Sequence, residues 1–378
     1  MSTALQQRRT QVAIFIVVLA GIIVLPLFFN PASGFVDDCT LALAYITMAL
    51  GLNIIVGFAG LLDLGYVAFY AIGAYTMGWL ASGFYADADI HIGVTGFAEN
   101  LPGIHLNFFL VLIAAMVFTT IAGIIIGLPT LRLRGDYIAI VTLAFGEIIG
   151  RVAINGDEIK FSEGFPLTNG RQGITPVDKI DLPFVDQFTS LNLRPWYWVA
   201  LGLVLVVLFV NFRLRDSRLG RAWIALREDE VAAISMGIPA VKTKLFAYGT
   251  GAAFGGISGA FLASYLNTVN ADQFQFSFSI FVLAMVILGG LGSIWGVVLG
   301  SVALTFINYR LIPDVLNDVP NKVGLDFDLT ELSFGIFGFL LVVMMVLRPE
   351  GLIPERRRQM ELEEGIGAGD TELELVEP

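Results

Sequence analysis

Long apolar runs recur along almost the whole chain and constrain its fold more than any other feature. About 20 consecutive apolar residues carry a helix across a bilayer's hydrocarbon core, which is roughly 30 Å thick. Only 15% of the 378 residues are charged, whereas a soluble domain usually carries about 25%. The sequence therefore predicts an all-α, polytopic transmembrane helical bundle. Its ten expected membrane segments are 11–29, 38–56, 64–83, 106–128, 137–154, 195–212, 245–266, 278–290, 293–309 and 332–347.

The chain divides into one transmembrane domain, residues 1–355, and an acidic tail, residues 356–378. Seven of the last eighteen residues are acidic and none is aromatic, so we expect a solvated, disordered tail. The sequence shows no basic face, and we expect no nucleic-acid partner. Arg8 and Arg9 precede the first segment, and a secretory signal peptide also begins with basic residues before an apolar run, so this alternative must be weighed. Because the run is long and nine more segments follow, an uncleaved first helix is favoured.

The two short segments 278–290 and 293–309 can form one long helix or a hairpin of two short ones. With a hairpin, fifteen of the 22 Lys and Arg residues lie in cytoplasmic segments. One long helix would instead export Arg356–Arg358, against the positive-inside tendency. The sequence thus predicts the hairpin in a bacterial inner membrane, with both termini and the acidic tail on the cytoplasmic side.

Polar groups and broken helices at membrane depth are costly, and both are candidate pathway features. Glu147 and Arg151 are four residues apart, which allows a structural ion pair on one helix face or a polar pathway wall. Asp63 precedes the third segment, where it is expected to cap free N–H groups, with transport as the alternative. The link between the two short segments is either a tight turn or a pathway element, and its glycines are Gly289, Gly290 and Gly292.

Small residues and missing motifs limit the chemistry. Gly251, Gly255 and Gly259 recur at spacing four, which favours close packing of a neighbouring helix or a subunit interface. The chain has no G-x-x-x-x-G-K-[ST] phosphate loop, one cysteine, and two histidines that fall in one predicted loop. We therefore expect no catalytic, cofactor or metal site on this chain.

The longest cytoplasmic stretch, residues 213–244, is expected to hold two short helices, at 222–226 and 230–236. The second helix carries a compact apolar surface at 231–234. That surface can pack on the chain's own membrane domain or dock into a groove on a cytoplasmic partner. The residues that separate the two helices are Arg227, Glu228 and Asp229, and Gly237 ends the second helix.

Residues 230–238 resemble the E-A-A-x-x-x-G loop of ABC importer permeases, with one residue inserted after Glu230. Further matching stretches follow one another in order at 53–65, 131–137, 216–223, 288–293 and 348–352. Across residues 38–355 they resemble the permeases of branched-chain amino acid ABC transporters, in particular the longer of the two paired permease subunits. The resemblance implies that this loop seats in an ATPase. The coupling residues would be Arg227, Glu228, Asp229, Glu230, Ala232, Ala233 and Gly237.

The resemblance also implies a type II-like ABC importer permease that moves branched-chain amino acids. Its partners would be a second homologous permease, two cytoplasmic ATPase subunits that bind ATP-Mg, a periplasmic substrate-binding protein and membrane lipids. Permeases for urea or other small amides are close alternatives. An ion-gradient-driven secondary transporter would explain the charges within segments but not the 213–244 loop. A membrane-embedded enzyme lacks residues for a metal or nucleophile site.

Overall fold

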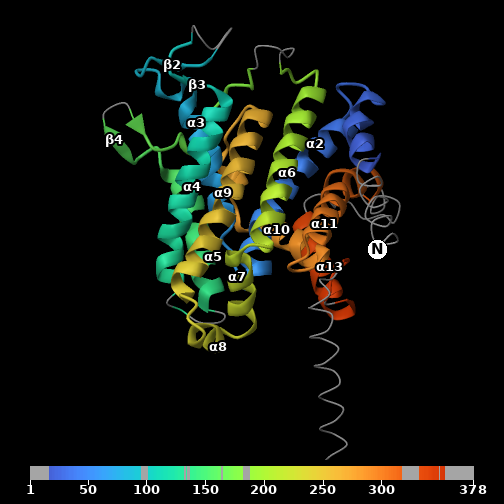
Figure 1. Cartoon of the computed structure of the whole chain (residues 1–378). Helices are drawn as coiled ribbons and strands as arrows, with labels where there is room; N and C mark the ends of the chain where they lie inside the picture. Colours follow the sequence, from blue (N-terminus) through green and yellow to red (C-terminus); the bar gives the residue numbers. More distant parts are fainter. Residues whose placement is uncertain are drawn as a thin grey trace, which may run out of the picture.

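The computed structural model describes residues 17–94, 101–131, 133, 137–162, 165–181, 188–316, 332–348 and 350–353. These residues form a mostly helical bundle (Figure 1). Six of their helices are long and apolar enough to cross a membrane. They are α2 (Gly34–Asn53) continued by the π-helix η2 (Ile54–Phe58), α4 (Phe108–Thr130), α5 (Tyr137–Asn155), α6 (Arg194–Arg215), α9 (Ala240–Leu266), and α11 (Ile294–Phe306) continued by the π-helix η7 (Ile307–Leu316).

Four shorter apolar helices fall in the other predicted segments. They are the helix at Val17–Leu27, which ends in η1 (Leu25–Leu27), α3 (Val67–Leu80), α10 (Phe276–Gly289) and α13 (Ser333–Leu347). The acidic tail lies outside the described residues.

The predicted all-α class misses short strands in the connections at one end of the bundle. One sheet has the order β1-β3-β2, in which β3 pairs antiparallel with β1 and parallel with β2. The other pairs two strands antiparallel. The strands are β1 (Ala81–Ser82), β2 (Ile90–Ile92), β3 (Ile104–Leu106), β4 (Lys160–Ser162) and β5 (Phe165–Pro166), and the connections also hold the 3₁₀ turns η3 (Gly83–Tyr85), η5 (Gly170–Gln172) and η6 (Ala271–Gln273). The helices α7 (Arg218–Glu228) and α8 (Glu230–Ser235) lie at the opposite end (Figure 1).

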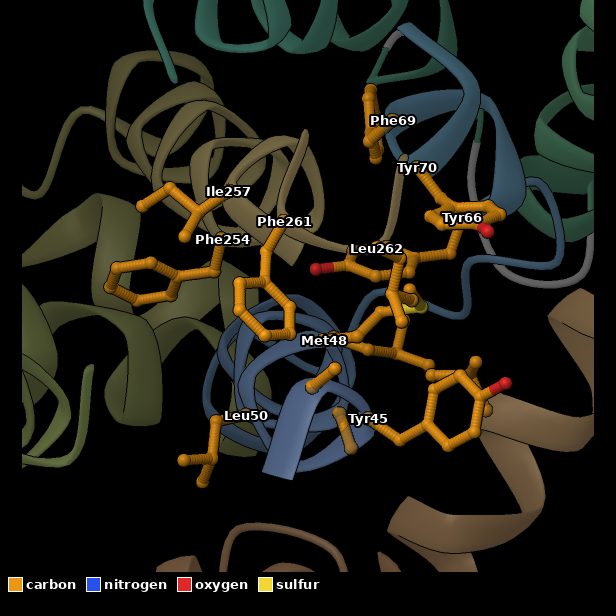
Figure 2. Packing of buried hydrophobic residues seen from close by; sticks show 14 of the residues in the cluster. Tyr45, Met48, Leu50, Tyr66, Phe69, Tyr70, Phe254, Ile257, Phe261 and Leu262 are labelled. Carbon is orange, nitrogen blue, oxygen red and sulfur yellow. The ribbon is translucent and has the colours of Figure 1, made fainter. Parts of the chain in front are cut away.

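Helices α2 and α9 form the centre of the bundle. Their most apolar stretches are 94% and 83% buried, against 28% for α4 and α5. Large side chains such as Met48, Tyr66 and Phe261 fill the space around them (Figure 2). The peripheral helices expose apolar side chains such as Ile125 and Phe209, as helices that face lipid do.

The glycines of α9 let neighbouring backbones approach closely. A methyl group built on Gly259 would overlap the carbonyl oxygen of Tyr70, and one on Gly73 of α3 would overlap that of Gly256. A methyl group on Gly251 would overlap Ile55 of η2. The stripe predicted at spacing four therefore packs α9 against α2, η2 and α3 of the same chain, and not against another subunit.

Helices α10 and α11 form the predicted hairpin. They pack against each other, and the turn between them contains Gly290 (φ 115°) and Gly292 (φ 84°), conformations that favour glycine. Ser293 then caps α11 by accepting a hydrogen bond from Gly296 N. The stretch after α13 closes over this turn, since Leu352 N donates to the Leu288 carbonyl.

Glycine-to-alanine substitutions test the close contact between α3 and α9. We expect Gly259→Ala and Gly73→Ala to cost about 1–3 kcal/mol each, because the added methyl group meets backbone that cannot rotate away. Gly202→Ala in α6 is the matched control, since nothing lies within 4 Å of its added methyl group. Thermal unfolding of the purified variants in detergent measures the difference. Equal midpoints for Gly259→Ala and Gly202→Ala would contradict this packing.

Candidate functional site

The two helices of the 213–244 stretch are built by side-chain caps. Ser217 accepts a hydrogen bond from Gly220 N at the start of α7. Asp229 accepts hydrogen bonds from Val231 N and Ala232 N, both at 2.9 Å, at the start of α8. The predicted first helix, 222–226, is therefore too short, because the cap at Ser217 starts it at Arg218 and it continues through Arg227 and Glu228. Only Asp229 separates the two helices, and Gly237 (φ 89°) follows the second.

Both helices are fixed to the start of α9. Trp223 is fully buried and donates a hydrogen bond to the carbonyl oxygen of Thr243 at 2.7 Å. Lys244 forms an ion pair with Glu230 of α8 at 2.8 Å. Ala233 is buried, whereas the side chain of its neighbour Ala232 is exposed, and the Ala232 N–H donates to the capping Asp229. These contacts make α7 and α8 one unit with the base of a central helix.

Arg227 connects this unit to α2. Its guanidinium donates a hydrogen bond to the carbonyl oxygen of Gly57 at 2.5 Å, and Gly57 lies in the π-helical segment η2. The Arg227 stem lies where a side chain on Gly60 (φ 68°) would be. π-helical turns are rare in proteins, and those that occur are often found at functional sites. The last turn of α7 therefore contacts the irregular end of a central helix.

The same π-helical segment meets the turn of the α10–α11 hairpin. Asn53 Oδ1 accepts a hydrogen bond from Gly292 N at 3.0 Å. A methyl group on Gly57 would lie 2.6 Å from that same nitrogen. Gly289 and Gly290 of the turn pack against Gly296 and against the chain after α13. We call Arg227, η2, Asn53 and the turn 289–293 the junction.

Asp63 lies in the non-helical stretch between η2 and α3. It is buried, and its Oδ1 accepts a hydrogen bond from Gly65 N at 2.9 Å. The next residue, Leu64, donates its N–H to Thr142 of α5 at 3.0 Å. Asp63 thus caps a free N–H group as predicted, but that group precedes the third helix, since α3 begins at Val67 and Tyr66 is its N-cap. Asp63 instead fixes the turn that leads into α3.

Glu147 and Arg151 stay apart from the junction. Both side chains are exposed on α5, and the ion pairs of the described residues do not include this pair. The predicted structural pair is wrong, because the spacing permits contact but the two charged groups do not come within ion-pair distance of each other. They line a groove of about 360 Å³ with neighbouring residues Ile148, Val152, Asn155 and Ile159.

The sequence indicated Arg227 as a coupling residue and Gly292 as a candidate pathway residue. The structure places both at one junction. Asn53 and Gly57, which complete this junction, were not predicted. A usable signal was present, because Asn53 is an amide within an otherwise apolar segment, and such a group needs an internal partner in lipid.

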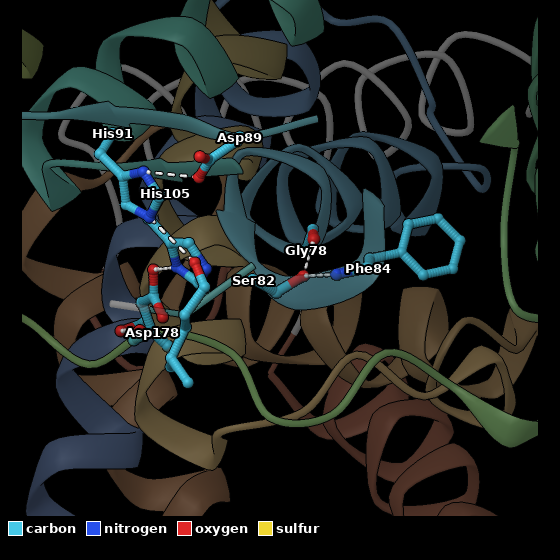
Figure 3. Close-up of polar contacts among 9 residues, drawn as sticks. Gly78, Ser82, Phe84, Asp89, His91, His105 and Asp178 are labelled. Carbon is cyan, nitrogen blue, oxygen red and sulfur yellow. Dashed lines mark hydrogen bonds and ion pairs between the residues drawn. The ribbon is translucent and has the colours of Figure 1, made fainter. Parts of the chain in front are cut away.

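The two histidines lie in a sheet at the other end of the bundle and not in a loop. His91 of β2 and His105 of β3 are register partners with stacked rings 5.3 Å apart (Figure 3). Buried His105 lies 2.6 Å from Asp178 through Nδ1 and Oδ2. Burial raises the pKa of the Asp178 carboxyl above its ordinary 3.8, and the hydrogen bond from His105 lowers it. Within the described ranges, no group of three or more His, Cys, Asp or Glu side chains could hold a metal ion.

The fold defines a multi-pass helical membrane protein. Residues 35–345 match the family of permease components of branched-chain amino acid transport systems, and the chain belongs to that family.

Individual relatives agree with this assignment. The high-affinity branched-chain amino acid transport system permease proteins LivM of Salmonella typhimurium and Escherichia coli are each 38% identical over 362 residues. These alignments cover 90% of this chain and 75% of each relative. The corresponding LivH of Escherichia coli is 21% identical over 326 residues, or 84% of this chain and 93% of that relative. No solved structure matches the chain.

Removing the guanidinium of Arg227 tests the junction. We expect Arg227→Met to speed amide hydrogen exchange in residues 54–59 and to cost about 1.5–3 kcal/mol, because the Gly57 carbonyl loses a charged donor. Arg227→Lys keeps a donor and is expected to lie in between. Arg221→Met is the control, since within the described residues Arg221 bonds only the nearby Asp216 carbonyl. Unchanged exchange in η2 of Arg227→Met would show that the bond does not hold this segment.

The His105–Asp178 contact predicts a pH dependence. In His105→Ala the pKa of Asp178 rises further, because the group that lowers it is gone. The variant is therefore destabilised most near pH 7, by about 1–3 kcal/mol. This loss shrinks as the pH falls through the raised pKa and Asp178 takes up a proton. Thermal unfolding of both proteins between pH 4 and 7, the range above the ordinary carboxyl pKa of about 4, measures the difference. A pH-independent difference would refute this account.

Proposed function

We propose that this chain is a permease subunit of an ATP-driven importer of branched-chain amino acids in a bacterial inner membrane. Its partners would be a second permease, two ATPase subunits that bind ATP-Mg, and a periplasmic substrate-binding protein. Family membership supports the transport role. The substrate rests on the LivM relatives. The second permease is supported by the match to LivH.

The exposed face of α8 is the observation that carries the proposal of a partner at this end. Val231 is 73% exposed, Ile234 is 51% exposed, and Met236, directly after the helix, is 86% exposed. A helix of six residues cannot reach across lipid, yet it is held rigidly by Trp223 and Lys244. Apolar side chains exposed on a rigidly held helix outside the membrane suit a partner's hydrophobic groove. This supports docking into an ATPase over packing on the chain's own membrane domain.

The junction would transmit a movement of the docked helices to the membrane domain. A shift of α7 and α8 would act on the Gly57 carbonyl through Arg227, and on the hairpin turn through Asn53 and Gly292. No bond needs to be made or broken on this chain. The required change is a displacement of helices, of the kind that ligand-driven closure of partner subunits produces.

The proposed topology keeps ten membrane segments, with the hairpin as two of them and both termini cytoplasmic. The four shorter apolar helices would then complete the six long ones as a type II-like permease. A gradient-driven transporter would need a relay of buried carboxylates to carry protons. Glu147 and Arg151 do not supply one, because both side chains are exposed. The relatives' names favour branched-chain amino acids over urea.

Acidic substitutions on α8 test the proposal. We expect Val231→Glu and Met236→Glu each to lower ATP-dependent leucine uptake by about tenfold or more, because a charge in an apolar interface costs at least about 1.4 kcal/mol. Leu219→Glu is the matched control, since Leu219 is also exposed but lies on α7. Uptake is measured after reconstitution with the second permease, the ATPases and the binding protein, alongside the thermal midpoint of each variant.

Two results would contradict the proposal. Uptake that continues without ATP would favour a gradient-driven transporter over an ATP-driven importer. Full activity of both α8 variants would show that this face docks no partner.

A further inference from the structure

A long apolar groove runs along the bundle between α4 and α6, with α9 as its floor. Its volume is about 860 Å³. On α9 it extends from Lys242 to Ile257, which at 1.5 Å per residue is about 22 Å. Gly249 deepens the floor, since a methyl group there would already lie 3.4 Å from the Thr120 side chain and fill the space between them. The groove is therefore longer than half of a hydrocarbon core roughly 30 Å thick.

The walls of the groove offer no free polar group over most of its length. Its hydroxyl groups belong to Thr120 and Thr250, and both are already donated to backbone carbonyls of their own helices. The other wall residues of α4 and α6 are Leu112, Met116, Val117, Ile121, Ile124, Leu203, Val206, Val207, Val210 and Leu214. A zwitterionic amino acid would leave its charges unsatisfied here, whereas acyl chains need only apolar contact.

One end of the groove is positively charged. Lys242 lines it and is exposed. Arg213 is exposed on α6, three residues after the wall residue Val210 and so on the same side of the helix. In the described part of the chain, neither cation has an ion pair or a hydrogen bond, in contrast to Lys244, which pairs with Glu230. The acid nearest in sequence to Arg213, Asp216, lies beside Arg215 at 3.5 Å.

We propose that this groove binds an anionic phospholipid of the leaflet at the α7 end. Its acyl chains lie between α4 and α6, and its phosphate lies between Lys242 and Arg213. Basic side chains near a membrane surface attract anionic lipid. The site adjoins the base of α9, where Trp223 anchors α7. A bound lipid would brace α6 against α9 beside the α7–α8 unit.

The proposal depends on the chain lying in a membrane and not on what it transports. It is tested with the purified full chain in detergent, so loss of lipid binding and loss of uptake are separate results. The probes are dioleoyl phosphatidylglycerol and dioleoyl phosphatidylcholine, which share acyl chains and differ in charge. Thermal midpoint and bound lipid, counted by native mass spectrometry, are measured against lipid concentration.

We expect phosphatidylglycerol to bind and to raise the midpoint, and phosphatidylcholine to bind more weakly by about tenfold or more. The double variant Lys242→Gln with Arg213→Gln should lose this preference. Arg218→Gln, an exposed cation of α7 away from the groove, should keep it. Val206→Trp should block both lipids by filling the groove, whereas Phe209→Trp, exposed on α6 but outside the groove, should block neither.

Three outcomes would overturn the site. Equal binding of the two lipids would remove the role of the two cations. Lipid binding by Val206→Trp equal to that of the parent would place the lipid elsewhere. Equal stabilisation by glycerol 3-phosphate alone would show an anion site that takes no acyl chain.

Discussion

Close backbone contact around α9 is the constraint on which the rest of the bundle depends. Lipid supplies no hydrophobic drive between helices, so they associate through close packing and hydrogen bonds. Gly73 and Gly259 bring the α3 and α9 backbones together, and Gly251 does the same for α9 and η2. With the centre packed in this way, the peripheral helices need only one buried face, and they present the other to lipid.

The junction follows from a second constraint, the need of irregular backbone for hydrogen-bond partners. It arises because the α2 helix changes to a π-helix at its end. The change to a π-helix at Ile54 shifts its hydrogen-bond pattern, and backbone groups inside a membrane need internal partners. Arg227 supplies one for the Gly57 carbonyl, while Asn53 satisfies the Gly292 amide of another element. These bonds join parts of the chain that are far apart in sequence, in an environment of low dielectric where they are strong.

Features set by local sequence could be predicted. Apolar length located the apolar helices, charge bias selected the hairpin, and glycine spacing gave the close packing of α9. Features set by distant partners could not. The spacing of Glu147 and Arg151 allowed a pair that their surroundings do not enforce, and Asp63 was assigned to a helix that starts later. Asn53 carried a local signal, but its partner Gly292, like Arg227, the partner of Gly57, lies about half a chain away, and no local pattern identifies these partners.

The two constraints together indicate where a movement of α7 would be absorbed. Sliding α9 past α3 would drive the backbone of Gly256 into that of Gly73, so this contact behaves as a rigid block. The stretch between η2 and α3 is not helical, and the hairpin turn is shaped by Gly290 and Gly292 in conformations few other residues adopt. Both lie beside the Arg227 contact. A displacement at Arg227 would therefore be taken up by these two segments while the glycine-packed centre moves as one body.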